Sequence, residues 1–277
     1  MQVSNAALLS GLKLLVQLVG GLRALARLSF GTLSFSTWSN RAARSGTDAP
    51  NISRKSITRG LTVHYVPHVL DNCSAAALST LTAKDYSEFL HIKHDGARNR
   101  SLMTRAALRR ALSEATHGEL APSQWVFVRD HVGKPKLAAF CPPVHFSCSH
   151  AEGVSVVAVS TRGPVGIDIA NASTVFDLSI TDLFLSPNEA RSIGKSHQRP
   201  ERQRQDFCRY WALKEAYLKM KGDVLSERVR NMEFDPIEDR LNFEPMVEKV
   251  PGQAKFKTWQ LATERNHFSA ALAFVGA

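Results

Sequence analysis

The sequence predicts an α+β fold made of two similar lobes within one chain of 277 residues. Strand and helix patterns follow one another along the chain, each half contains a long helical segment, and each half ends in a strand–turn–strand pattern. The hydrophobic content of 44% can fill a core. An approximate repeat of this kind predicts two lobes that face each other, with a ligand site along their shared seam.

The first half is expected to begin after Gly60. Strands are expected where apolar and polar residues alternate, and helices where apolar residues recur at every third or fourth position. A Gly-Lys-Pro sequence at Gly133–Pro135 predicts a turn. In chain order the expected elements are a strand over Leu61–Val66, helices over Leu78–Leu90 and Arg98–Ala115, and strands over Trp125–Arg129, His145–Ser147 and Val154–Ser160.

The second half repeats this order and closes on a terminal hairpin. Its helical segment is apolar over most of its circumference and also carries several charges. In chain order the expected elements are a strand over Val165–Ala170, a helix over Asp206–Lys221, a strand over Asn231–Asp235, and hairpin strands over Thr258–Thr263 and Phe268–Val275.

The formal net charge of +10 is distributed unevenly. Met1–Thr47 carries five basic residues and no acidic ones, which leaves 30 basic against 25 acidic residues in the rest of the chain. Such a surface suits an acidic protein or a polyphosphate ligand as well as nucleic acid. Because no regular Lys/Arg stripe is interleaved with aromatic residues, nucleic acid is not expected as a partner.

Residues 1–55 are expected to form a separate targeting or disordered segment. Its apolar stretch Ala6–Leu28 is interrupted by Lys13, Arg23 and Arg27, which argues against a membrane span. An Arg-bearing, Ser-rich, acid-free amphipathic start is typical of a mitochondrial or plastid transit peptide. The expected location is therefore mitochondrial. An untargeted extension and a cytoplasmic location are the alternatives.

The four cysteines are spread through the chain without a CxxC pair, which suggests free thiols in a reducing compartment. One cluster contains Cys141, His145, Cys148 and His150. Its spacings do not match a zinc ribbon or a zinc finger. No zinc site is expected there.

The most informative segment is Phe207–Gly222, FCRYWALKEAYLKMKG, whose apolar side chains cover well over half of a helical wheel. A helix of this kind is usually buried, yet it carries Lys214, Glu215, Lys219 and Lys221. Buried charges are costly unless they are paired or coordinate something. One interpretation is a surface ion pair between Glu215 and Lys219, four residues apart. The other is a phosphate site bridged by a metal ion.

A second informative segment is the strand Val165–Ala170, VGIDIA. Alternation places Asp168 on one face between the small residues Gly166 and Ala170, which predicts room for a bulky ligand beside the carboxylate. Together with Glu215, Asp168 could complete a Mg²⁺ site. Magnesium favours one or two carboxylates supplemented by substrate phosphates and water.

A third segment is Phe146–His150, FSCSH, which follows the Gly-Lys-Pro turn. Ser149 and His150 are expected where a strand gives way to a turn, and Lys134 lies near in sequence. Hydroxyl, imidazole and ammonium groups together make a reasonable phosphate-contact set. A serine hydrolase is excluded because no GxSxG elbow is present and no acid is placed to orient the histidine.

These segments together resemble the 4′-phosphopantetheinyl transferase superfamily, in particular its eukaryotic aminoadipate-semialdehyde dehydrogenase-phosphopantetheinyl transferase type. The resemblance covers roughly Leu61–Val275. The matching segments, in order, are RSLMTRAALRR (Arg100–Arg110), GKPKL (Gly133–Leu137), FSCSH (Phe146–His150), GIDIA (Gly166–Ala170), LFLSPNE (Leu183–Glu189), FCRYWALKEAYLKMKG (Phe207–Gly222) and NMEFDP (Asn231–Pro236).

The resemblance implies transfer of the 4′-phosphopantetheine group of coenzyme A to a serine of an acyl carrier protein, with release of 3′,5′-ADP. It also implies a pseudo-twofold monomer with an N-terminal lobe over residues 56–162 and a C-terminal lobe, carrying the metal site, over residues 163–277. A catalytically inactive coenzyme A-binding protein and, as a weaker option, a basic nucleic-acid-binding protein remain as alternatives.

By the same resemblance, Asp168 and Glu215 match the magnesium ligands of the family. Glu215 would also take the proton from the acceptor serine. Lys219 matches the lysine that contacts the coenzyme A diphosphate and eases departure of 3′,5′-ADP. Many bacterial members have a further acid two residues after the aspartate, where this chain has Ala170. A site with two carboxylates and water is therefore expected.

The resemblance assigns a second group of residues to the nucleotide end of coenzyme A. Lys134, Ser149 and His150 match positions that hold this end, with His150 near the 3′-phosphate. Arg105 resembles the basic residue of the family that acts on the same end.

Overall fold

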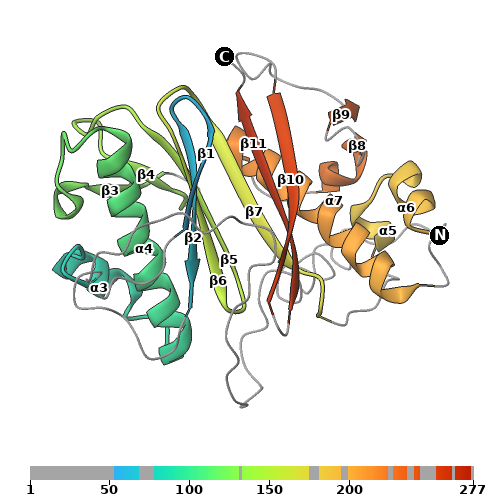
Figure 1. Ribbon diagram of the computed structural model, residues 1–277, viewed down its shortest axis with the longest axis horizontal. Coiled ribbons are helices and arrows are strands. Elements are labelled where there is room, and N and C mark those ends of the chain that lie inside the picture. The colour runs from blue at the N-terminus through green and yellow to red at the C-terminus, as the bar shows by residue number, and fades with distance from the viewer. Residues whose placement is uncertain are drawn as a thin grey trace. The chain divides into compact units, whose positions relative to one another are not determined.

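The computed structural model describes residues 53–68, 78–130, 133–174, 181–194, 199–223, 227–235, 240–243, 254–263 and 266–275 (Figure 1). The described residues divide into two compact units at Val165 and Gly166, except that His150–Glu152 cluster with the C-terminal unit. Each unit combines helices and strands, so the α+β class is confirmed. The N-terminal segment predicted to target the protein lies, up to residue 52, outside the described residues.

The N-terminal unit contains a four-stranded sheet in the order β1-β2-β6-β5. Strands β2 and β6 are buried throughout and pair antiparallel, with Leu61 opposite Ser160. Strand β1 was not predicted, and its first residues had been assigned to the N-terminal segment. The strands are β1 (Ser53–Thr58), β2 (Leu61–Pro67), β5 (His145–Ala151) and β6 (Val154–Ser160).

Helix α4 (Asp95–Ala115) packs on β2 and β6, as Figure 1 shows. It confirms the predicted helix and begins three residues earlier. Its apolar face joins a core that includes Leu112, Trp125 and Val157. The preceding helix, α3 (Ala83–Phe89), is shorter than predicted because the Thr82 side chain caps it in a capping box with Asp85.

A small hairpin of β3 (Phe127–Arg129) and β4 (Pro135–Leu137) completes the N-terminal unit, after a short 3₁₀ helix at Pro122–Gln124. The predicted turn between these strands is confirmed. Gly133 has a φ of 83°, in the left-handed region that favours glycine, and its N–H donates to the carbonyl of Asp130 at 2.9 Å.

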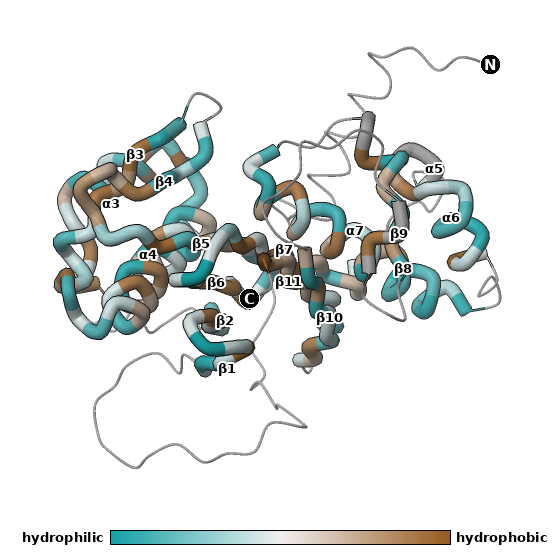
Figure 2. Tube along the Cα trace, turned by 90° about the horizontal axis from the view of Figure 1, so that it is seen from above, coloured by the Kyte–Doolittle hydropathy of each residue, from teal (hydrophilic) through white to brown (hydrophobic). Residues whose placement is uncertain are grey.

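The C-terminal unit contains a three-stranded sheet in the order β10-β11-β7. The predicted terminal hairpin is confirmed and is longer than expected. Helix α7 (Pro200–Lys221) packs on β11 and β10 (Figure 1), and Figure 2 shows hydrophobic and hydrophilic residues following one another closely along it. The strands are β7 (Val165–Asn171), β10 (Ala254–Ala262) and β11 (His267–Val275).

Shorter elements cover the other side of α7. Helix α6 packs on α7 and on β8, which pairs antiparallel with β9. These elements are α5 (Thr181–Phe184), α6 (Pro187–Gly194), a 3₁₀ helix at Glu227–Asn231, β8 (Glu233–Asp235) and β9 (Arg240–Phe243). Within the described part of the chain, no helix combines the length and the hydropathy needed to cross a membrane.

Candidate active site

The position of the site is set by a close approach between β7 and α7 at Gly166. A Cβ at this position would overlap the backbone carbonyl oxygen of Ala216 and lie 2.5 Å from the backbone nitrogen of Met220. Only glycine therefore lets the helix backbone rest on the strand. The sequence had predicted that small residues beside Asp168 leave room for a ligand. At Gly166 this interpretation is wrong, because α7 itself fills the space.

Asp168 follows two residues along the same face of β7 and meets Lys219 of α7. The Asp168 side chain is 7% exposed, and its Oδ1 lies 2.6 Å from Nζ of Lys219. The same Nζ donates to the carbonyl of Ile167 at 3.2 Å. The close helix–strand contact thus joins a buried carboxylate to an ammonium group 51 residues further along the chain.

Glu215 lies one helical turn before Lys219 and shares its surroundings. Burial raises the pKa of the Glu215 carboxyl, the ammonium of Lys219 lowers it, and the negative charge of Asp168 raises it, with a net result of about 7. Lys219 bonds a buried carboxylate on β7, so the alternative of an ordinary surface pair with Glu215 does not describe this site. The structure brings Asp168, Glu215 and Lys219 together.

The donor set at this site fits a divalent cation. Two carboxylates supply hard oxygen ligands, and the raised pKa of Glu215 indicates a carboxylate whose negative charge is under-compensated. Among the residues that the structure describes, no group of three or more His, Cys, Asp or Glu side chains could hold a metal ion. A cation here would therefore take its remaining ligands from substrate oxygens and water, as magnesium does.

Lys214, next to Glu215, has a different role. Its side chain is completely buried, and its Nζ lies 2.6 Å from Oε2 of Glu189. The same ammonium donates to the carbonyls of Phe184 and Val229 at 3.0 and 3.1 Å. Because every bond of this ammonium ends on neighbouring elements, Lys214 fixes the rotation of α7 about its axis.

Glu189 of α6 was not singled out from the sequence as a functional residue. Its Oε2 accepts the N–H of Ser186 at 2.8 Å and its Oε1 accepts the N–H of Phe234 at 2.9 Å. Together with Lys214 it links α6, α7 and β8 through one satisfied buried ion pair. The available signal was the capping-box pattern of Ser186 followed three residues later by Glu189, at the end of the segment LFLSPNE.

The residues predicted to hold the nucleotide end of coenzyme A lie on other elements than Asp168, Glu215 and Lys219. Lys134 lies half-buried in the β3–β4 turn, where its N–H donates to Asp130 Oδ1 at 2.8 Å. Strand β5 continues through Ser149 and His150, so the predicted change from strand to turn at these residues is wrong. Ser149 is half-buried and His150 exposed, as expected for consecutive strand residues on opposite faces. Their role at the nucleotide stays a prediction.

Arg105, also predicted at the nucleotide end, is buried in the N-terminal unit. Its Nη1 donates to Asp85 Oδ1 at 3.0 Å and its Nη2 to Glu88 Oε2 at 3.1 Å. The guanidinium lies 4.2 Å from the ring centroid of Phe127, a cation–π contact. A contact between Arg105 and the nucleotide would have to replace one of these internal bonds.

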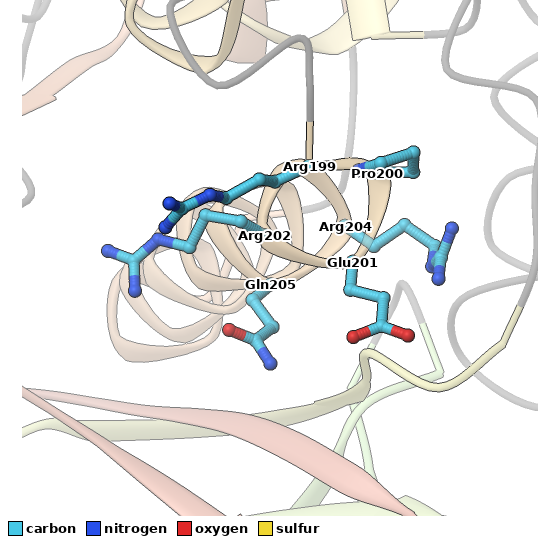
Figure 3. A pocket seen from close by; sticks show the side chains of 6 residues that line it. All are labelled: Arg199, Pro200, Glu201, Arg202, Arg204 and Gln205. Atoms are coloured by element: carbon cyan, nitrogen blue, oxygen red, sulfur yellow. The ribbon is translucent and has the colours of Figure 1, made fainter.

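A pocket of about 490 Å³ lies at the amino end of α7, away from this site. Figure 3 shows Arg199 and Arg202 extending to one side of the helix and Arg204 to the other. Ten residues of helix separate Gln205 from Glu215, which corresponds to about 15 Å. The arginines do not converge on one point, so we assign no ligand to this pocket. Its lining residues are Arg199, Pro200, Glu201, Arg202, Arg204 and Gln205.

The part of the chain that carries this site is similar to known proteins. The family model described as the 4′-phosphopantetheinyl transferase superfamily matches residues 164–273, which contain Asp168, Glu215 and Lys219. The chain is 32% identical over 151 residues to a 4′-phosphopantetheinyl transferase of Bacillus subtilis, an alignment that covers 54% of this chain and 63% of the relative.

A fungal protein is similar at the same level. The chain is 32% identical over 148 residues to the L-aminoadipate-semialdehyde dehydrogenase-phosphopantetheinyl transferase of Eremothecium gossypii, covering 50% of this chain and 52% of that protein. The alignments with this and the Bacillus relative thus span between half and two thirds of the relatives' length.

Proposed function

We propose that this chain, whose residues 164–273 match the 4′-phosphopantetheinyl transferase superfamily, transfers the 4′-phosphopantetheine group of coenzyme A to a serine of acyl carrier protein-type domains. The second product is 3′,5′-ADP. The observation that carries the proposal is the meeting of Asp168, Glu215 and Lys219 on β7 and α7, with an ion pair of 2.6 Å and a carboxyl pKa of about 7.

In the proposed reaction the hydroxyl oxygen of the carrier serine forms a bond to the phosphorus that carries the pantetheine arm. The bond between this phosphorus and the bridging oxygen of the diphosphate breaks, and the electron pair leaves with 3′,5′-ADP. Glu215 takes the hydroxyl proton, directly or through a water molecule. A carboxylate whose pKa is close to neutral is well suited to this proton transfer.

The charged side chains of Lys219 and Asp168 also have roles in the proposed reaction. Lys219 offsets the negative charge that develops on the leaving 3′,5′-ADP, and Asp168 holds the Lys219 ammonium in position before the reaction. Asp168 and Glu215 would hold Mg²⁺, which when bound supplies neutralisation of the diphosphate charge.

The remaining features follow from the family resemblance. We propose that Lys134, Ser149 and His150 hold the nucleotide end of coenzyme A. We also propose that the two units form similar lobes in a pseudo-twofold arrangement within a monomer. The basic excess of the chain favours encounter with an acidic carrier protein. Mitochondrial targeting by the N-terminal segment belongs to the same proposal.

The test separates binding from transfer. The full chain is incubated with coenzyme A, a carrier protein and magnesium, and 3′,5′-ADP is quantified by chromatography. The proposal predicts one molecule of 3′,5′-ADP for each carrier serine. The control is a carrier whose acceptor serine is replaced by alanine. Tight binding of coenzyme A without 3′,5′-ADP release would instead indicate a non-catalytic coenzyme A-binding protein.

A further inference from the structure

The inference concerns a chain of charge-assisted hydrogen bonds in the N-terminal unit that leads from Arg105 to the β3–β4 turn. Arg105 Nη2 donates to Glu88 Oε2 at 3.1 Å, and Nη2 of Arg129 donates to the other oxygen of the same carboxylate. Nη1 of Arg129 in turn donates to the carbonyl of Gly133 at 2.8 Å. Lys134 is the next residue, so helix α4 and the backbone that carries Lys134 are joined through three side chains, those of Arg105, Glu88 and Arg129.

A second set of contacts holds the other end of the hairpin. The guanidinium of Arg105 lies against the ring of Phe127, the first residue of β3, and Nζ of Lys84 donates to the Phe127 carbonyl at 3.3 Å. Arg109 also lies over this ring, at 5.1 Å from its centroid. The first residue of β3, Phe127, is thus held by Arg105, Arg109 and Lys84. Its last residue, Arg129, is held by Glu88, which also bonds Arg105.

Arg105 itself is unsuited to a direct ligand contact. Its side chain is 7% exposed, and two of its nitrogens already bond carboxylates. One of these carboxylates, Asp85, is 2% exposed and is also bonded by Arg109 at 2.7 Å. Exchanging a bond to a buried carboxylate for a bond to a phosphate would leave that carboxylate under-compensated, which is costly in the interior.

We propose that Arg105 is a positioning residue for coenzyme A, which sets the place of Lys134 through Glu88 and Arg129 without touching the ligand. The inference rests on the proposed function, because Lys134 is assigned to coenzyme A only there. It replaces the direct nucleotide contact that the sequence predicted for Arg105.

The test compares two ligands and two matched variants. Arg129→Met removes the bonds to Glu88 and Gly133, and its side chain is 50% exposed, so the fold should tolerate the change. Arg54→Met is the control: its side chain is 53% exposed and loses one ion pair, with Glu114, outside the chain of bonds. Arg105→Lys keeps the charge and loses the two-pronged geometry.

Dissociation constants for coenzyme A and for its 3′-dephospho analogue are measured by calorimetry. We expect Arg105→Lys and Arg129→Met each to raise the dissociation constants of both ligands by the same factor, on the order of three- to tenfold. The double variant should bind the ligands about as tightly as the single variant with the larger loss, because both substitutions break the same chain of bonds. Arg54→Met should stay within about twofold. The kcat at saturating coenzyme A should also change less than about twofold.

Two results would overturn the inference. A loss of affinity in Arg105→Lys for coenzyme A alone would mean that Arg105 reads the 3′-phosphate directly. Unchanged affinity for both ligands in Arg129→Met would mean that the bond chain does not position Lys134. Failure of the wild-type chain to bind coenzyme A would count against the proposed function instead. Hydrogen exchange of the β3–β4 turn, expected to be faster in both variants, then tests the bond chain without any ligand.

Discussion

The raised pKa of Glu215 makes the catalytic rate depend on pH. Its carboxyl carries a proton in much of the population below pH 7 and cannot then accept one from the carrier serine. We therefore predict that kcat/KM falls as pH decreases below about 7, by up to tenfold per pH unit at low magnesium. Raised magnesium should move the midpoint to lower pH, because protons and the cation compete for the carboxylate. A pH–rate profile that is flat from 5.5 to 8 would contradict this role.

The same pKa gives a prediction about stability. The folded chain binds the Glu215 proton more tightly than the unfolded chain, whose carboxyl has its ordinary pKa of 4.5, so stability falls as pH rises from about 4.5 through about 7. Glu215→Gln removes the buried charge. We expect this variant to melt at a higher temperature than wild type at pH 8, with the difference shrinking toward pH 5.

Activity of Glu215→Gln should move in the opposite direction, falling at least about a hundredfold, since the base is lost. Thermal melts and initial rates on the same samples check both halves of the prediction. A variant that is less stable than wild type at pH 8 would show that the carboxylate is favourably paired when charged.

Asp168 should act mainly through the cation and through Lys219. Asp168→Asn keeps the shape of the side chain and removes its charge, so we predict a lower rate at limiting magnesium and partial recovery as magnesium is raised. The measurement is a magnesium titration of the initial rate for wild type and variant. Equal half-saturating magnesium concentrations in the two proteins would show that Asp168 is not a ligand of the metal ion.

At the scale of elements, the contact of β7 with α7 depends on Gly166. Gly166→Ala must push the strand and helix backbones apart, because the new methyl group would overlap the carbonyl of Ala216. We predict a loss of stability of about 1–3 kcal/mol together with a large loss of kcat, because Asp168 moves away from Lys219. Gly194→Ala in α6, where a Cβ meets nothing within 4 Å, is the matched control.

Chemical denaturation and initial rates of the two glycine variants check this prediction. If Gly166→Ala lost stability while keeping its kcat, the close approach would support the fold and not the site.

The order of most larger elements could be predicted from hydrophobic periodicity, but some boundaries could not. Helix α7 begins at Pro200, six residues before its predicted start, because its first turns, PERQRQ, are polar and show no apolar stripe. Strand β5 continues past its predicted end to Ala151, although the polar residues Ser149 and His150 had indicated a turn. Strand β1 escaped prediction because only Ile57 interrupts its polar sequence, SRKSIT.

The candidate site could be predicted in part. The charges of an apolar helix and a lone acid between small residues pointed to Asp168 and Glu215. The sequence could not show that Lys219 bonds Asp168 or that Lys214 bonds Glu189. Both contacts depend on how α7 is rotated about its axis relative to the neighbouring elements. The internal bonds of Arg105 could not be predicted either, because its partners Asp85 and Glu88 lie on a separate helix, α3.

At the scale of the whole molecule, the motif residues all lie outside the N-terminal segment. Removal of Met1–Thr47 should therefore leave the rate of transfer and the melting temperature nearly unchanged. Rates and melts of the shortened chain beside the full chain check this. A large drop in either quantity would mean that the segment stabilises the body of the protein, and the targeting proposal would lose its support.

All of these predictions depend on the proposal that this chain transfers phosphopantetheine with Asp168, Glu215 and Lys219. The decisive measurement is intact mass spectrometry of a carrier protein after incubation with coenzyme A, magnesium and the enzyme. We expect a mass gain of one phosphopantetheine on the acceptor serine with the wild-type chain, and a gain slowed at least about a hundredfold with Glu215→Gln. No mass gain with the wild-type chain, or an equal rate with Glu215→Gln, would contradict it.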